Sequence, residues 1–76
     1  MQNNNRLLVG DNIRKWRMIK GFKQITFAKL IGISKATLSK IENNKQEVGV
    51  WRLQEIASCL NVKPAQLLKD PEELFT

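Results

Sequence analysis

The chain has 76 residues, which is enough for one domain and too few for two, so we expect a single fold to carry the whole function. Its 42% hydrophobic and 26% charged residues are typical of a folded globular domain, and it contains no run of about 18 apolar residues that could span a membrane. With no histidine and one cysteine, it has neither a zinc-finger pattern nor the Ser-His or Cys-His pair of a nucleophilic enzyme, so we expect no enzyme, no metal and no other cofactor.

Positive charge is concentrated in the first part of the chain. The formal net charge is +6, but residues 1–45 hold ten basic and two acidic side chains, whereas residues 46–76 hold three basic and five acidic ones. A polyanion would therefore approach the N-terminal two-thirds of the molecule. Charge alone leaves a nucleic-acid partner and a merely well-solvated surface about equally plausible, so the spacing of residues has to decide between them.

The spacing of apolar residues predicts five helices and no strand, hence an all-α fold. Gly21 and Gly32 stand where the first two helices end, and Asn61 stands at the end of the fourth, in positions suited to left-handed backbone. Cys59 lies in an apolar pattern and is expected to be a buried small residue. The predicted helices span 6–20, 24–31, 34–43, 50–60 and 64–69.

The second and third predicted helices form the most informative segment. Ala28 is small enough for a neighbouring helix to cross close to it, and Gly32 permits the sharp turn that follows. Ser34 can cap the next helix, in which Leu38 and Ile41 face inward. The opposite face, free of acidic residues until Glu42, suits the major groove of DNA, although a plain solvated face is the alternative; it holds Lys35, Ala36, Thr37, Ser39, Lys40 and Asn43.

A specific set of residues carries a family resemblance over about residues 9–69. The set comprises Ile13, Arg14, Arg17, Gly21-Phe22-Lys23-Gln24, Phe27-Ala28, Ile31-Gly32-Ile33-Ser34, Leu38-Ser39-Lys40-Ile41-Glu42, Leu53, Ile56-Ala57, Leu60 and Val62. With these residues the chain resembles the phage repressor and Cro type of helix-turn-helix proteins, also called XRE-like. The resemblance implies a compact five-helix lambda-repressor-like domain at 9–69, preceded by an N-terminal segment with the start of helix 1 at 1–8 and followed by a tail at 70–76.

The resemblance also implies roles for individual residues. Lys35, Ala36 and Lys40 fall where the family reads bases, since lysine can donate to guanine and the alanine methyl can touch thymine. Arg17 and Glu42 match a structural ion pair that joins helix 1 to the end of helix 3. The residues expected at phosphates or at the groove edge are Gln24, Ser34, Thr37, Ser39, Asn43 and Lys45.

Some positions depart from the family pattern. Lys23 stands where a serine or threonine usually caps helix 2, Asn44 replaces a frequent glycine, and Val48-Gly49 replaces a proline-containing pair before helix 4. In addition, bulky apolar residues stand at positions that are often polar in the family, which indicates exposed apolar surface; these are Trp16, Ile25, Leu30 and Trp51. Leu74 and Phe75 in the tail could pack across a dimer axis, or the terminus could fray.

We therefore expect a bacterial or phage-encoded transcriptional regulator that stays in the cytoplasm and acts as a repressor. It would be a homodimer whose recognition helices, at about 34–43, enter successive major grooves of a near-palindromic operator. Small repressors and restriction-modification controllers fit equally well, and we expect neither a membrane nor a small-molecule ligand. The alternative is a protein-interaction module, antitoxin-like or adaptor-like, that uses the apolar residues around Trp16, Leu30 and Trp51.

Overall fold

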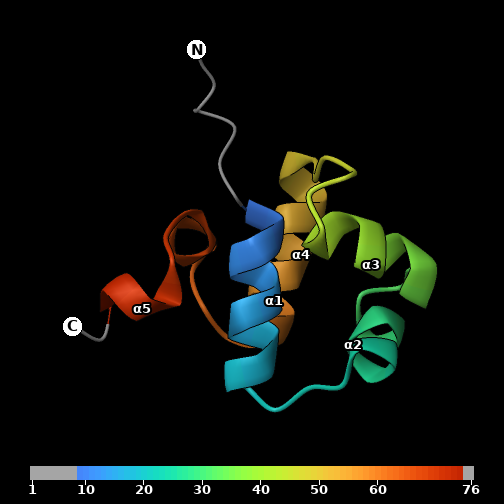
Figure 1. Ribbon diagram of the computed structural model, residues 1–76, viewed down its shortest axis with the longest axis horizontal. Helices are drawn as coiled ribbons and strands as arrows, with labels where there is room; N and C mark the ends of the chain where they lie inside the picture. The colour runs from blue at the N-terminus through green and yellow to red at the C-terminus, as the bar shows by residue number, and fades with distance from the viewer. Residues whose placement is uncertain (1–8, 75–76) are drawn as a thin grey trace.

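The computed structural model describes residues 9–74, and these form an all-helical domain (Figure 1). No strand occurs within this range, in agreement with the predicted fold class. The predicted start of the first helix, at residues 6–8, lies outside the described residues. The elements are α1 (Val9–Ile19), α2 (Gln24–Leu30), α3 (Lys35–Glu42), α4 (Val50–Leu60), the 3-10 helix η1 (Pro64–Leu68) and α5 (Pro71–Leu74).

The core lies where α1, α2, α3, α4 and η1 meet, and apolar residues at helical spacing supply it. Ile13, Phe27, Leu38 and Ile56 are each 0% exposed, and they come from four different helices. Since burying an aliphatic or aromatic side chain of this size stabilises a fold by roughly 1.5–3 kcal/mol, this cluster fixes how the helices pack. Leu38 and Ile41, at 0% and 2% exposed, confirm the predicted inward face of α3.

Residues with a left-handed backbone conformation stand at the turns between helices. Gly21 has φ +81° and Gly32 has φ +75°, and Asn61, which ends α4, has φ +58°. All three were predicted to take this conformation, and the prediction is confirmed. Asn44, which follows α3, has φ +59°, so asparagine adopts here the backbone that the frequent glycine of the family would favour.

Two sequence-based expectations about burial were wrong, namely that Cys59 is buried and that Trp16 is exposed. The departure from the family pattern indicated exposure of Trp16, although helical spacing places it on the same face of α1 as the buried Ile13. Trp16 is only 5% exposed, because its indole lies against the core and its Nε1 donates to the Gln66 carbonyl at 3.2 Å. The indole thus satisfies its one polar group at the 3-10 helix, a hydrogen-bond partner that the spacing of residues in α1 does not reveal. Cys59 is half-buried rather than buried, because it lies on the edge of α4 that faces the end of α2, with Sγ 4.0 Å from the Leu30 carbonyl oxygen.

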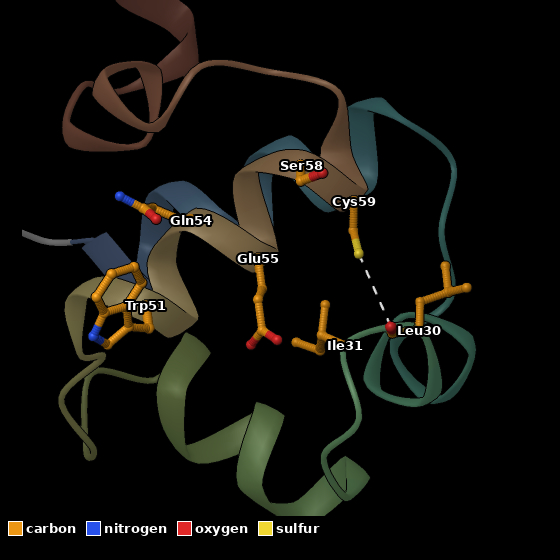
Figure 2. Close-up of a pocket in the computed structure, with 7 residues that line it drawn as sticks. All are labelled: Leu30, Ile31, Trp51, Gln54, Glu55, Ser58 and Cys59. Atoms are coloured by element: carbon orange, nitrogen blue, oxygen red, sulfur yellow. Dashed lines mark hydrogen bonds between the residues drawn. The ribbon is translucent and has the colours of Figure 1, made fainter.

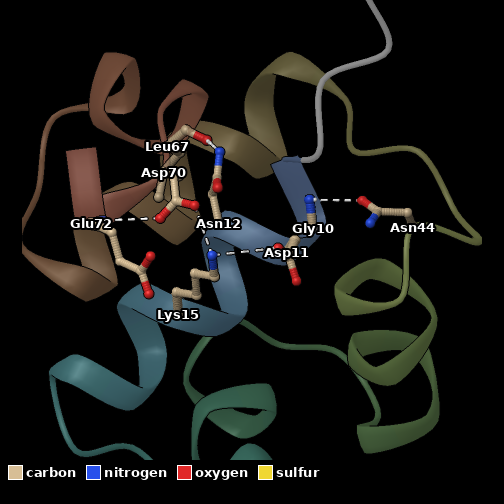
Figure 3. Close-up of polar contacts among 8 residues, drawn as sticks. All are labelled: Gly10, Asp11, Asn12, Lys15, Asn44, Leu67, Asp70 and Glu72. Carbon is tan, nitrogen blue, oxygen red and sulfur yellow. Dashed lines mark hydrogen bonds and ion pairs between the residues drawn. The ribbon is translucent and has the colours of Figure 1, made fainter. Parts of the chain in front are cut away.

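The residues after α4 pack against α1. The predicted fifth helix is a 3-10 helix, and the short α5 that follows it had not been predicted. The Asn12 amide donates to the Leu67 carbonyl at 3.1 Å, and Lys15 Nζ lies 2.7 Å from Asp70 Oδ2 (Figure 3). Pro71, at the start of α5, is fully buried. The packed part of the molecule therefore reaches beyond residue 69.

Candidate nucleic-acid interface

The turn between α2 and α3 is tight and is held from both sides. The Ile33 amide donates to the Ala28 carbonyl at 3.0 Å, which closes the C-terminal end of α2. Ala28 is 1% exposed, so the small side chain does lie at a helix contact. On the other side of the turn, Arg52 of α4 donates from Nη1 to the Ile31 carbonyl at 2.8 Å. The turn is thereby fixed to α4 as well as to α2.

Ser34 starts α3 as an N-cap. Its hydroxyl oxygen accepts a hydrogen bond from the Thr37 amide at 3.0 Å, and the hydroxyl donates to Thr37 Oγ1, also at 3.0 Å. A side-chain acceptor at this position satisfies one of the amides that a helix leaves without a partner at its N-terminus. The first turn of α3, which holds the residues predicted to read bases, is thus well defined.

The outer face of α3 matches the surface that the sequence predicted. Lys35, Ala36 and Lys40 are exposed, Thr37 and Ser39 are half-buried at the edges of the helix, and Asn43 and Lys45 are exposed after its last turn. Leu38 and Ile41 face the core, 0% and 2% exposed. The acidic residue of α3, Glu42, is 3% exposed and turned inward, so no carboxylate stands on the outer face.

Glu42 is the centre of a buried polar network. Arg17 binds it with two hydrogen bonds, from Nε to Oε2 at 2.6 Å and from Nη2 to Oε1 at 3.1 Å, and also donates to the Phe22 carbonyl at 2.8 Å. The Gln24 amide donates to Glu42 Oε1 at 3.0 Å. This network joins α1, the start of α2 and the end of α3 in one rigid arrangement.

The network also bears on Gln24, which was predicted at a phosphate. Its side-chain amide nitrogen is directed at Glu42, which orients the residue at the first position of α2. Lys23 precedes it in the cap position and makes no side-chain cap hydrogen bond, as its departure from the usual serine or threonine suggested. The start of α2 is therefore held by Glu42 rather than by a local cap.

Two contacts in this region had not been predicted. The Asn44 side chain accepts a hydrogen bond from the Gly10 amide at 3.0 Å, and Arg52 binds the Ile31 carbonyl (Figure 3 shows the first). Both join residues more than 20 positions apart in the chain. For the first contact, Gly10 within the predicted first helix was the available signal, because a glycine inside a helix often marks a close approach.

A shallow apolar groove of about 510 Å³ lies between α4 and the end of α2 (Figure 2). Trp51 is 80% exposed and Leu30 is 53% exposed, so the exposure predicted for these two is confirmed, as it is for Ile25 at 51%. Trp16, which was expected beside them, is buried. The groove is lined by Leu30, Ile31, Trp51, Gln54, Glu55, Ser58 and Cys59.

Within residues 9–74, the structure shows neither a candidate metal site nor a candidate membrane-spanning helix. No cluster of three or more histidine, cysteine, aspartate or glutamate side chains in this range could hold a metal ion. Nor does any helix within the same range have the length and apolar character needed to cross a membrane. The Arg17–Glu42 pair is buried, with side chains only 11% and 2% exposed, and it joins α1 to the last residue of α3.

Two helices joined by a tight turn, with the second held by its buried edge and presenting a basic outer face, define a helix-turn-helix domain. The helix-turn-helix family model matches residues 13–67, well over half of the chain. The chain belongs to this family, whose members include the repressor and Cro type named above. It is thereby assigned to a class of DNA-binding transcriptional regulators.

Curated relatives support the same assignment. The chain is 38% identical over 64 residues to the HTH-type transcriptional regulator YazB of Bacillus subtilis, covering 84% of this chain and 91% of YazB. It is 34% identical over 62 residues to the HTH-type transcriptional regulator y4wC of Sinorhizobium fredii, covering 82% of this chain. The chain spans nearly the whole of YazB but only 43% of y4wC.

Solved structures give the same fold. The N-terminal DNA-binding domain of SinR from Bacillus subtilis superimposes with a TM-score of 0.73 at 30% identity, covering 82% of this chain and 91% of that domain. SinR in complex with DNA superimposes with a TM-score of 0.74 at 31% identity, covering 80% of this chain and 98% of that one. The chain thus shares its fold with a protein that has been crystallised on DNA.

Proposed function

We propose that this protein binds specific sites in double-stranded DNA by placing α3 in the major groove, and represses transcription from them. The observation that carries the proposal is the outer face of α3, which is basic, free of carboxylates and rigidly held from beneath. Lys35, Ala36 and Lys40 are assigned to base edges, where lysine donates to guanine O6 or N7 and a methyl group contacts thymine. The backbone contacts are assigned to Gln24, Ser34, Thr37, Ser39, Asn43 and Lys45.

The active form is proposed to be a homodimer. Two copies of α3 related by a two-fold axis, about 34 Å apart, would read the halves of a near-palindromic operator from one side of the duplex. One domain of this size covers only a short half-site, so a dimer would raise both affinity and specificity. SinR bound to DNA supports the placement of the helix-turn-helix unit, whereas dimerisation of this chain rests on the geometry of paired major grooves.

The test begins with operators enriched from random duplexes by the wild-type protein. Affinities of wild type, Lys35→Ala and Lys40→Ala are then measured by fluorescence anisotropy on the enriched operator and on an unrelated duplex, over a salt series. Removing a base contact should weaken the operator complex by about 1–3 kcal/mol and relax the sequence preference at one position, with little change on unrelated DNA. The matched control is Lys69→Ala, which removes an exposed lysine of the C-terminal region.

The salt series distinguishes contacts to phosphates from contacts to bases. Each phosphate neutralised contributes a slope of about 0.9 in the logarithm of affinity against the logarithm of salt concentration. Lys45→Ala should lower that slope and weaken both duplexes equally, because a phosphate contact carries no sequence information. If no sequence is enriched and binding does not depend on salt, the proposed function is wrong.

A protein-interaction module is the second candidate. It is supported by the exposed Trp51 and Leu30 beside the groove between α2 and α4, since large exposed apolar side chains often mark a binding surface. Burial of Trp16 removes one of the residues on which this candidate rested. Failure to enrich any operator, together with oligomerisation that Trp51→Lys abolishes, would favour it over DNA binding.

A further inference from the structure

Two polar contacts join α1 to the end of α3 and the residues directly after it. One is the Arg17–Glu42 pair described above, and the other is the hydrogen bond from the Gly10 amide to the Asn44 side-chain oxygen at 3.0 Å (Figure 3). Gly10 and Arg17 are seven residues apart and lie on the same face of α1, about 10 Å apart along its axis. The end of α3 is thereby held to α1 at two separate points.

The contact at Gly10 brings backbone against backbone. A Cβ at position 10 would lie 1.9 Å from the Ile41 carbonyl oxygen, so α1 approaches α3 as closely as it does only because this residue is glycine. The left-handed backbone of Asn44, at φ +59°, turns its side chain back to the start of α1. There its oxygen accepts a hydrogen bond from the Gly10 amide, at the start of the described part of α1.

We propose that Asn44 is a positioning residue for the recognition helix, acting through its hydrogen bond to Gly10. This inference rests on the proposed function of α3. The turn before α3 is tied to α2 and α4, so the first turn of α3 is held in place. Apolar burial of Leu38 and Ile41 is non-directional, so it leaves the direction of the last turn weakly determined. A hydrogen bond is directional, and a second one at a distance from the Arg17–Glu42 pair removes that freedom.

The length of α3 makes this direction matter. Its eight residues span about 12 Å, so a change of 10° about its first turn would move the last turn by about 2 Å. Lys40, which is assigned to a base edge, lies in that last turn, and base readout tolerates displacements of only about 0.5 Å. Loss of the contact at Asn44 should therefore reduce discrimination between DNA sequences more than it reduces stability or binding to DNA in general.

The variant that tests this proposal is Asn44→Gly, which keeps the left-handed backbone and removes only the acceptor. The matched control is Asn61→Gly, the same change at φ +58° at the end of α4, where the asparagine side chain makes no hydrogen bond within residues 9–74. A second variant, Asn44→Asp, retains the acceptor and restores the contact. The readout is the ratio of affinities for the enriched operator and for an unrelated duplex, with the melting temperature measured alongside.

Asn44→Gly should lower the affinity ratio about fivefold, near the lower end of the discrimination that one base contact provides, with unrelated DNA bound as tightly as by wild type. Asn61→Gly should leave the ratio unchanged. Asn44→Asp should keep the wild-type ratio even though its added negative charge weakens both complexes. An unchanged ratio in Asn44→Gly, equal losses on both duplexes, or a loss in Asn44→Asp as large as in Asn44→Gly would each overturn the proposal.

The proposed function and the positioning role can fail separately. If wild type enriches no operator, the proposed function and the positioning role are both wrong. If wild type enriches an operator and Asn44→Gly distinguishes it from unrelated DNA equally well, only the positioning role is wrong. Residual dipolar couplings of the free protein give a readout without DNA: the angle between α1 and α3 should change in Asn44→Gly and not in Asn61→Gly, and an unchanged angle would overturn the inference.

Discussion

The guanidinium of Arg52 in α4 donates a hydrogen bond to the carbonyl of Ile31 at the end of α2, at a distance of 2.8 Å. Ile31 is the C-cap of α2, and its carbonyl belongs to the group of acceptors that a helix leaves unsatisfied at its end. A cation at this end also interacts favourably with the helix dipole. The side chain of Arg52 thus ties the turn of the helix-turn-helix unit to the helix behind it.

Replacing Arg52 by methionine should lower the free energy of unfolding by about 1 kcal/mol, since the lost hydrogen bond is charge-assisted but partly exposed to water. Urea denaturation monitored by circular dichroism measures this difference. Glu55→Gln is the control, because it removes only the exposed ion pair between Arg52 and Glu55 and should change the free energy by less than about 0.5 kcal/mol. Equal effects of the two changes would contradict the role of the Ile31 contact.

The buried Arg17–Glu42 pair allows a second prediction. Glu42→Leu leaves the Arg17 guanidinium nearly buried without its carboxylate, which should cost about 3–5 kcal/mol and unfold much of a small domain. The double variant Arg17→Met, Glu42→Leu buries no unpaired charge and should be more stable than Glu42→Leu alone. Thermal melts of the three proteins would show the order, and a double variant that melts below the single one would contradict this account.

Much of the fold follows from local patterns in the sequence. Ile13, Phe27, Leu38 and Ile56 each belong to an apolar pattern within their own helix, and all prove to be buried. The outer face of α3 was predictable for the same reason, because a helix with one apolar edge exposes the residues opposite that edge. The correct predictions therefore came from the spacing of apolar residues along a single helix, which identifies its buried and its exposed face.

The features that were missed depend on contacts between distant segments. Whether Trp16 is exposed depends on η1, which supplies a carbonyl for its indole, and neither the spacing in α1 nor a family average reveals that partner. The short α5 depends on Asp70 and Pro71, which pack against α1, whereas composition favours a plain tail. The contact of Gly10 with Asn44 depends on the crossing of α1 and α3. Such contacts follow from the packing of the whole domain, so local patterns in the sequence did not predict these three features.

The ion pair between Lys15 and Asp70 predicts how stability depends on pH. The hydrogen bond from Lys15, and secondly that from the Glu72 amide, hold the pKa of Asp70 below its ordinary value of 3.8. A group with a lowered pKa in the folded state adds stability above its ordinary pKa, and that stability is lost as the pH falls through the folded pKa. The contribution of Asp70 should therefore be complete at neutral pH and disappear in acid below 3.8.

Asp70→Asn isolates this effect, because asparagine can still accept the hydrogen bond from the Glu72 amide but carries no charge. The free energies of unfolding of wild type and variant, measured from about pH 3 to pH 7, should differ most near neutrality and converge in acid. At the alkaline end, the hydrogen bond to Asp70 raises the pKa of Lys15 above 10.5, so the pair should weaken only above that pH. A difference that grows as the pH falls would contradict this assignment.

The close approach of α1 and α3 gives the last prediction. In Gly10→Ala the added methyl group would meet the Ile41 carbonyl oxygen at 1.9 Å, and because that atom belongs to the backbone of α3 the helices themselves have to separate. Overpacking of this kind typically costs about 1–3 kcal/mol, which outweighs the gain from replacing a helical glycine by alanine, about 1 kcal/mol at most. The melting temperature should therefore fall, with the Gly10–Asn44 hydrogen bond lost at the same time.

Gly49→Ala is the control for this change. A Cβ at position 49 meets no atom within 4 Å, so the only cost is that of alanine in place of glycine at the N-cap of α4, and the melting temperature should fall less than in Gly10→Ala. Hydrogen exchange adds a local readout, since the Gly10 amide should exchange slowly in wild type and in Gly49→Ala and faster in Asn44→Gly. If Gly10→Ala melts at the wild-type temperature, α1 can move away from α3 at no cost, and the close contact does not fix the recognition helix.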